Sequence, residues 1–216
     1  MRAATVLISC AGKVHMAIMQ KVTGIVAVLF VFALMLAFGC AGAAIPQGVT
    51  SDGHPYRGSA NPKLVIYEYS DFECPFCARA LPAIDEVLRA HPNDVQLQFR
   101  YFPLVGIHPR GMPSALAGFC AEKQGKFWQM HDLMFANQDK LGDADLKKYA
   151  NEAGLDVQKF AQCLPSEEAA GRVKADMDDG TALGVHGTPS FSVGGSLVIG
   201  TPQLRQIVDA ELAKVG

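Results

Sequence analysis

The stretch that decides the fold is residues 65–77, Val-Ile-Tyr-Glu-Tyr-Ser-Asp-Phe-Glu-Cys-Pro-Phe-Cys. Its β-branched and aromatic beginning is typical of a strand. After the cysteines, apolar residues recur with helical spacing as far as Leu88. The motif Cys74-Pro75-Phe76-Cys77 therefore lies where a strand gives way to a helix. Pro75 suits the first helical turn, because its missing N–H costs little there.

This position predicts chemistry for Cys74. Free N–H groups and the helix dipole favour an anion at a helix start, which lowers the pKa of a thiol. A thiolate is the nucleophile of disulfide exchange. The alternative is a zinc site, which needs two further ligands at suitable spacing. The sequence has no second Cys-x-x-Cys and no flanking His-x-x-x-His, so we favour a redox pair and expect no metal or other cofactor.

Composition limits the other classes of function. The chain has 216 residues, of which 50% are hydrophobic, and this excludes a disordered protein. The net charge is −2 and no basic cluster is present, so nothing favours nucleic-acid binding. No Gly-rich phosphate loop follows the first strand, so nucleotide binding is not supported either.

The N-terminal part predicts export. Lys21 precedes a mostly apolar, uncharged run that ends at Gly39, and small residues follow, as in a signal peptide over residues 1–39. The residues Leu-Ala-Phe-Gly before Cys40 resemble a bacterial lipobox, which implies cleavage there and lipidation of the Cys40 thiol. Cleavage at a nearby alanine, or retention of the apolar run as an anchor, are the alternatives. Residues 40–61 are rich in Gly, Pro, Ser and Ala and predict a flexible, lipid-anchored linker.

The remaining cysteines are even in number, as expected in an oxidising compartment. Cys10 lies in the export segment, and the lipobox explains Cys40. By elimination Cys120 pairs with Cys163, and a structural disulfide is favoured over a second redox pair.

The order of predicted elements is βαβ, then helices, then ββα, an α/β fold. Alternation of apolar and polar residues over Val95–Tyr101 predicts a strand parallel to the first one. A helical insertion covers about residues 111–184. Gly194-Gly195 predicts a hairpin, and Pro202–Lys214 a closing helix.

Together these features resemble a known family. Cys-x-x-Cys at a strand–helix junction, in a βαβ…ββα chain with Gly-Thr-Pro (187–189) before a hairpin, is similar to the thioredoxin fold. The helical insertion brings it closer to the DsbA-like thiol oxidoreductases. The resemblance covers residues 62–216 as one thioredoxin-like domain.

The resemblance implies roles for site residues. Cys74 would be the exposed nucleophile and Cys77 the buried resolving thiol. Pro189 would be cis and lie beside them, and Thr188 would bind substrate through its backbone and touch the sulfurs. In the family the pair that matches Cys120 and Cys163 is typically a structural disulfide.

Two residues near the motif carry further expectations. Glu68 matches the family's buried acid and would shuttle a proton to and from Cys77, although the residues alone leave open a rim glutamate in water. Phe76 stands where the most oxidising members have His, so Cys74 should be less acidic than the ~3.5 of DsbA itself and the protein an oxidant of intermediate strength. With Phe72, Phe76 would form an apolar surface for unfolded substrates.

The predicted function is an exported thiol–disulfide oxidoreductase that forms disulfides at Cys74–Cys77. We expect it on the periplasmic or outer side of a bacterial cell envelope, lipid-anchored. Its partners would be reduced exported proteins and a membrane quinone-linked reoxidase of the DsbB or vitamin K epoxide reductase type. The alternatives are a disulfide reductase or isomerase, and a chaperone or interaction module whose disulfide is only structural.

Overall fold

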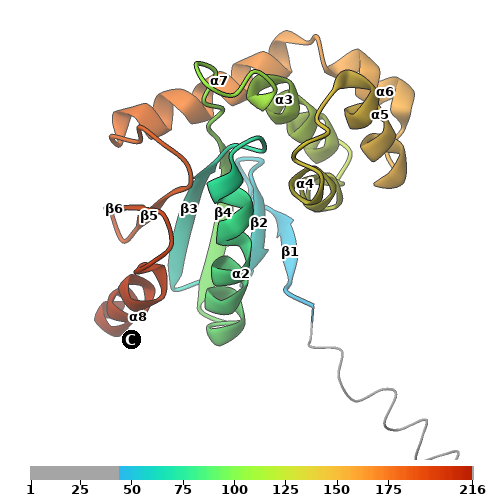
Figure 1. Cartoon of the computed structure of the whole chain (residues 1–216). Coiled ribbons are helices and arrows are strands. Elements are labelled where there is room, and N and C mark those ends of the chain that lie inside the picture. Colours follow the sequence, from blue (N-terminus) through green and yellow to red (C-terminus); the bar gives the residue numbers. More distant parts are fainter. Residues whose placement is uncertain (1–43, 216) are drawn as a thin grey trace, which may run out of the picture. The chain divides into compact units, whose positions relative to one another are not determined.

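The computed structural model describes residues 44–215, in which one sheet carries helices on both faces (Figure 1). The strand order is β1-β2-β4-β3-β5-β6, and β3 and β4 are the parallel pair while the other neighbours are antiparallel. The strands are β1 (Gln47–Val49), β2 (Pro55–Gly58), β3 (Leu64–Ser70), β4 (Val95–Tyr101), β5 (Ser190–Val193) and β6 (Ser196–Ile199). The helices are α2 (Pro75–Ala90), α3 (Gly111–Glu122), α4 (Phe127–Ala136), α5 (Asp143–Glu152), α6 (Val157–Cys163), α7 (Glu167–Ala182) and α8 (Leu204–Val215).

The predicted parallel βαβ unit is present as β3, α2 and β4. The two strands are in register from Leu64 beside Val95 to Ser70 beside Tyr101. Along α2 the buried residues recur at helical spacing and belong to the same core as the apolar residues of β4. This packing fixes the start of α2, and with it the two cysteines, at the carboxyl end of β3.

The other face of β4 is polar but equally buried. Gln96, Gln98 and Arg100 alternate with the apolar residues, and every residue of β4 is buried. Gln96 donates to the Ser59 carbonyl (2.7 Å), Gln98 to Gln96 (2.8 Å) and Arg100 to Gln98 (3.0 Å). Each of these three side chains therefore has at least one acceptor on this covered face, although Nη1 of Arg100 has no hydrogen-bond partner among the described residues.

The prediction of a flexible linker over residues 40–61 is wrong for residues 47–58, which form the β1–β2 hairpin. Thr50 closes its turn by accepting from His54 N–H (2.8 Å) and donating to the His54 carbonyl (3.1 Å). Strand β2 then pairs antiparallel with β4. The Gly- and Pro-rich composition of this segment is typical of a linker. It gave no sign of two short strands, because their stability comes from a partner strand far along the chain.

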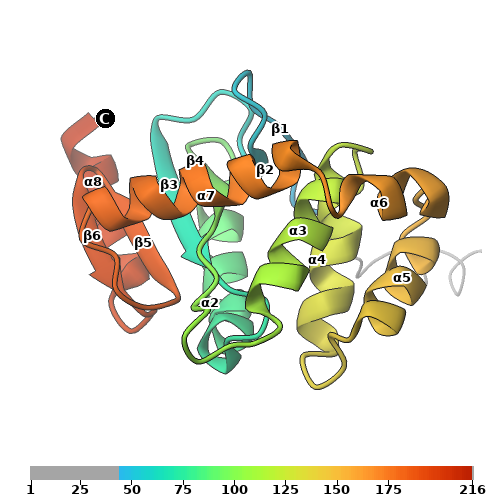
Figure 2. The ribbon, with the colours of Figure 1, turned by 90° about the horizontal axis from the view of Figure 1, so that it is seen from above.

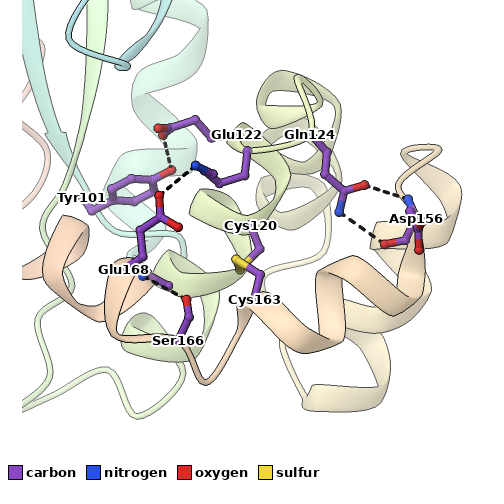
Figure 3. Close-up of a disulfide and its surroundings, with 10 residues drawn as sticks. Tyr101, Cys120, Glu122, Gln124, Asp156, Cys163, Ser166 and Glu168 are labelled. Atoms are coloured by element: carbon purple, nitrogen blue, oxygen red, sulfur yellow. Dashed lines mark hydrogen bonds and ion pairs between the residues drawn. A yellow bond between two sulfur atoms is a disulfide. The ribbon is translucent and has the colours of Figure 1, made fainter.

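The helical insertion lies in its predicted place and runs from Gly111 to Ala182. Helices α3 to α6 lie beside the sheet, while α7 returns across the face opposite α2 (Figure 2). The predicted disulfide joins Cys120 of α3 to Cys163 of α6 (Figure 3). It therefore fastens the outermost part of the insertion to the helix that packs on the core.

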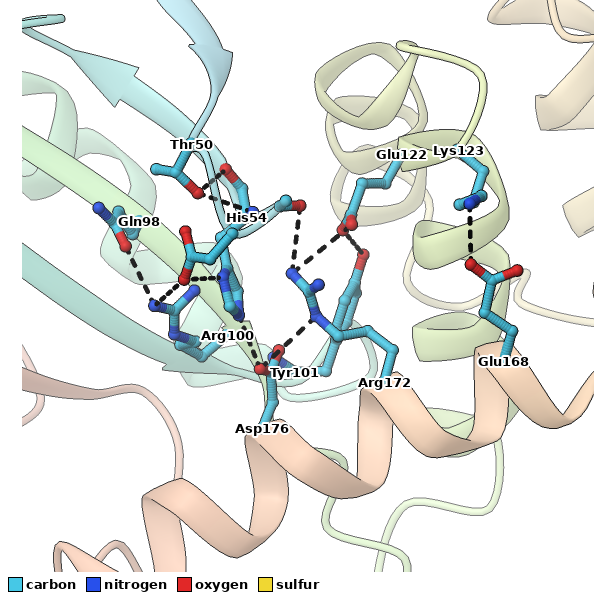
Figure 4. A network of polar contacts seen from close by, with 12 residues as sticks. Thr50, His54, Gln98, Arg100, Tyr101, Glu122, Lys123, Glu168, Arg172 and Asp176 are labelled. Carbon is cyan, nitrogen blue, oxygen red and sulfur yellow. Dashed lines mark hydrogen bonds and ion pairs between the residues drawn. The ribbon is translucent and has the colours of Figure 1, made fainter.

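A buried polar network holds α7 against the sheet (Figure 4). Asp176 accepts from the Tyr101 backbone N–H (2.9 Å), and its carboxylate lies 3.0 Å from the His54 ring and 3.7 Å from Arg172. Arg172 also pairs with Glu122 (3.5 Å), and burial raises the pKa of Glu122 to about 7. The network thus connects the hairpin, β4, α3 and α7.

The predicted signal peptide (residues 1–39) and the lipidation site Cys40 lie outside the described residues. Within residues 44–215, no helix combines the length and the apolar character needed to span a membrane.

Candidate functional site

The two cysteines of the motif occupy the start of α2, as predicted. Cys74 is the N-cap residue, with extended backbone, and Pro75 is the first helical residue. The Cys74 N–H donates to the Asp71 carbonyl (3.0 Å), and the Cys77 N–H donates to the Cys74 carbonyl (3.1 Å). Gln138 of the insertion donates to the carbonyls of Phe72 (2.8 Å) and Cys74 (2.9 Å). The turn that carries Cys74 is therefore held by its own backbone hydrogen bonds and by the side chain of Gln138 in the helical insertion.

The environment separates the two thiols chemically. The pKa of Cys74 is lowered to about 5, first by a hydrogen bond from the Cys77 thiol and then by the Thr188 hydroxyl and the N–H groups of Cys77 and Phe76. Burial raises the pKa of Cys77 far above its ordinary value. Cys74 is thus the thiolate and Cys77 the neutral thiol at pH 7. That Cys74 is less acidic than the ~3.5 of DsbA stays a prediction.

The prediction that Cys74 is exposed is wrong, because it is 2% exposed and Cys77 0%. The Thr188-Pro189 segment covers it. Its peptide bond is cis, as predicted, and the Thr188 carbonyl oxygen lies 3.3 Å from Cys74 Sγ, where it accepts a hydrogen bond only while Cys74 is protonated. The nucleophile therefore lies under the segment expected to bind substrate, instead of standing free of it.

Glu68 lies behind the motif and is 1% exposed, so the alternative of a rim glutamate in water is wrong. Burial raises its pKa to about 7, while the Ser70 hydroxyl and Arg57 act in the opposite direction. The neighbouring Tyr69 points to the other face, where its hydroxyl donates to Asp179 of α7. Glu68 and Ser70 therefore share the face of β3 that Cys77 packs against.

Ser70 is a site residue that sequence reasoning missed. Its hydroxyl is close enough to both Glu68 and Cys77 to lower the pKa of each. Neither Ser70 Oγ nor Glu68 Oε1 has a hydrogen-bond partner among residues 44–215. Both oxygens are therefore buried without a hydrogen-bond partner in the described part of the chain. The signal in the sequence was its spacing, two residues after Glu68 on the same strand.

Asp71 was also missed. Its side chain is fully buried and accepts from the N–H groups of Glu73 (2.9 Å) and Leu104 (2.8 Å), with the His108 ring 2.7 Å away. Its side chain joins the loop after β4 to the turn before the motif, and its backbone carbonyl accepts from the Cys74 N–H, so Asp71 positions the cysteines. An acid between a strand and Cys-x-x-Cys is the pattern that marks it.

A pocket of about 360 Å³ opens beside the cysteines. Phe76 is 62% exposed on its rim, whereas Phe72 is buried in the core, so the predicted apolar surface consists of Phe76 without Phe72. The pocket is lined by Phe76, Arg79, Thr188, Pro189, Ile199, Gly200, Thr201 and Pro202. The structure thus brings the predicted substrate-binding residues Phe76, Thr188 and Pro189 to one place.

The other predicted positions lie apart from this site. Cys120 and Cys163 are in the helical insertion. Among the described residues, no group of three His, Cys, Asp or Glu side chains is arranged to hold a metal ion.

A protein family and several solved structures resemble this chain. The model of the thioredoxin family matches residues 50–210. A thioredoxin-like oxidoreductase from Silicibacter pomeroyi superposes with a TM-score of 0.68 at 28% identity, over 76% of this chain and 94% of that one. The thiol–disulfide exchange protein α-DsbA2 from Wolbachia pipientis superposes with a TM-score of 0.65 over 73% and 86% of the two chains, and at 20% identity it supports the fold.

Curated relatives carry a different name. The Na⁺/H⁺ antiporter NhaA 3 from Salinispora tropica is 40% identical over 147 residues, which are 68% of this chain and 22% of the antiporter. The chain thus spans less than a quarter of the length of that relative, and the name describes the whole of that protein.

Proposed function

The chain belongs to the thioredoxin family, and from this premise we propose that it is an exported oxidoreductase that forms disulfides in other exported proteins. The observation that carries the proposal is the unequal pair of thiols. Cys74 has a pKa lowered to about 5 beside Cys77, whose pKa is strongly raised. In the oxidised pair the Cys74 sulfur is the atom that a substrate thiolate attacks, and its low thiol pKa makes Cys74 a good leaving group when the substrate disulfide forms.

The reaction begins with the oxidised Cys74–Cys77 pair. A substrate thiolate attacks Cys74 Sγ, a substrate–Cys74 disulfide forms, and Cys77 leaves and takes up a proton. A second substrate thiolate then attacks the substrate sulfur of that bond, and Cys74 leaves as a thiolate. The substrate is released with a disulfide, and the two electrons it lost remain on the reduced Cys74 and Cys77.

Glu68 is the group we assign to the proton of Cys77. The Cys77 sulfur is fully buried, so its thiolate cannot take a proton directly from solvent. Because the pKa of Glu68 is raised to about 7, the carboxyl carries a proton in a large share of molecules near neutral pH. A group poised near the working pH is the effective general acid and base.

Location and partners complete the proposal. The predicted signal peptide and the lipidation of Cys40 favour an extracytoplasmic, membrane-anchored protein. Reduced Cys74 and Cys77 would be reoxidised by a membrane quinone-linked partner of the DsbB or vitamin K epoxide reductase type. Unfolded exported proteins would reach the cysteines over the exposed Phe76.

Oxidation of reduced, unfolded ribonuclease A by the oxidised protein tests this function. We expect about one substrate disulfide per oxidised protein molecule, and no reaction with Cys74→Ser. A matched control, Ser196→Ala on the exposed end of β6, should react as the wild type does. Activity retained by Cys74→Ser would favour the chaperone or interaction module and overturn the proposal.

The redox potential of the Cys74–Cys77 pair separates the oxidant from the reductase or isomerase. Equilibration with glutathione, read by mass spectrometry, measures it. A potential as low as the roughly −270 mV of thioredoxin would overturn the oxidant assignment while leaving thiol–disulfide exchange intact.

A further inference from the structure

The pocket beside Cys74 contains one charge. Of the residues that line it, Arg79 is the only charged one, and the others are apolar, glycine or threonine. The Thr188 carbonyl oxygen lies 3.3 Å from Cys74 Sγ, and Thr188 forms part of the pocket wall, so the pocket adjoins the reacting sulfur. A peptide that presents a cysteine to Cys74 would place its neighbouring side chains here.

Within residues 44–215 Arg79 has no acidic partner and lies against an aromatic ring. Its guanidinium carbon lies 4.4 Å from the centre of the Phe76 ring, a cation–π contact with an exposed aromatic residue. No carboxylate of residues 44–215 forms an ion pair with it. Other arginines of that region do pair with carboxylates, namely Arg57, Arg100, Arg110, Arg172 and Arg205. Arg79 therefore presents a positive charge at the edge of the site that no carboxylate of the described region compensates.

Stabilisation of the Cys74 thiolate does not explain the positive charge of Arg79 at this position. The pKa of Cys74 is lowered chiefly by the Cys77 thiol, the Thr188 hydroxyl and backbone N–H groups, and Arg79 is not among these groups. Arg79 follows Cys74 by five residues, an axial rise of about 7.5 Å along the helix, and its guanidinium lies against the ring of Phe76, two residues after Cys74. In an extended peptide, residues two apart lie on the same side and are separated by about 7 Å.

We propose that Arg79 binds the carboxylate of a substrate Asp or Glu that lies two residues from the reacting cysteine in an extended segment. Phe76, Pro189 and Ile199 would contact the apolar parts of the same segment. The inference rests on the proposed function and deepens it, because it names the class of peptide that the site oxidises most rapidly.

The test measures formation of the substrate–Cys74 disulfide by the oxidised protein. The probes are peptides that carry Glu, Gln or Lys two residues before or two residues after a single cysteine. Quenched samples are quantified by mass spectrometry. Each rate is divided by the rate of the same peptide with glutathione disulfide, which corrects for the effect of a neighbouring charge on the peptide thiol.

The wild type should prefer the Glu peptide over the Gln peptide in at least one of the two positions by roughly 2- to 5-fold, the range expected for a solvent-accessible ion pair. Added salt should reduce this preference. Arg79→Gln should abolish it, and Arg79→Lys should retain part of it. Arg89→Gln, in the last turn of the same helix, is the matched control and should keep the full preference.

An equal preference for Glu in the wild type and in Arg79→Gln would overturn the inference, and so would no preference in the wild type. Both results leave the proposed function standing, because the peptides still react. Failure of the wild type to react with any peptide would instead count against the proposed function. Near-ultraviolet circular dichroism of Arg79→Gln verifies that the variant is folded.

Discussion

The low pKa of Cys74 should make the stability of the reduced protein depend on pH. The thiol has a pKa of about 5 in the folded protein, against an ordinary value of 9.0. Between these values the folded state has lost a proton that the unfolded chain still binds. A lowered pKa therefore stabilises the folded state above the unfolded value, and this stabilisation is lost as the pH falls through about 5.

The size of the effect follows from the same values. The two pKa values differ by about four pH units, and pH 7 lies two units above the folded value. Two units correspond to about 3 kcal/mol of unfolding free energy. It should increase by roughly 1.4 kcal/mol per pH unit from pH 5 upward. Near pH 9 Cys77 begins to oppose it, because its raised pKa keeps the folded thiol neutral while the unfolded one ionises.

Urea unfolding of the reduced protein, followed by the fluorescence of Trp128, measures this dependence. Trp128 is suitable because it is the single tryptophan of the chain and is buried. The free energies of the wild type and of Cys74→Ser are compared at several pH values from 4.5 to 8.5. Mass spectrometry verifies that the disulfide between Cys120 and Cys163 stays closed in both proteins.

The difference in unfolding free energy between the wild type and Cys74→Ser should increase with pH and be constant below pH 5. The subtraction removes the carboxylates and histidines common to both proteins. A difference that stays constant from pH 4.5 to 8.5 would show that Cys74 titrates alike in the folded and unfolded states. The assignment of Cys74 as the thiolate would then be refuted.

Other groups give predictions of their own. Glu68→Gln should slow substrate oxidation by roughly 100-fold and remove the pH dependence near 7, which a pH–rate profile measures. Ser70→Ala should shift that dependence to higher pH, because its hydroxyl lowers the pKa of Glu68; an unchanged profile would contradict the assigned contact. Replacing Cys120 and Cys163 by Ala should cost up to about 4 kcal/mol in urea unfolding, since the bond closes a loop with a sequence separation of 43, and should leave the rate of exchange unchanged. Asp176→Asn should cost roughly 3 kcal/mol, because it leaves a buried network uncompensated, and a change under 1 kcal/mol would contradict this account.

The parts of the fold that depend on local chemistry were predictable. Strict alternation gave β4, and a proline directly after Cys74 gave the start of α2. The hairpin at Gly194-Gly195 followed from the need for positive φ, which both glycines adopt. In each case one short segment contains the whole physical cause.

The features that the sequence did not predict depend on residues far along the chain. The β1–β2 hairpin is stable because β2 pairs with β4 and because His54 reaches Asp176, which lies 122 residues further along the chain. Gln138 supports the Cys74 turn from 64 residues away. Asp71, Ser70 and Arg79 stand next to the motif, but their roles depend on which groups surround them. Local composition contains none of this information.

The geometry also bears on the direction of electron flow. The groups that stabilise the Cys74 thiolate act only in the reduced state, since a disulfide carries no charge for them to stabilise. They therefore favour reduction of the site, and hence oxidation of its substrate. At pH 7 a thiol of pKa 5 is ionised about a hundredfold more favourably than one of pKa 9, which corresponds to roughly 60 mV for a two-electron couple. A pKa of ~3.5 would add about 45 mV more. The Phe76 side chain supplies no hydrogen bond or charge to Cys74, so only the Cys77 thiol, Thr188 and the backbone N–H groups of the turn lower the pKa of Cys74, and on this ground we expect an oxidant of intermediate strength.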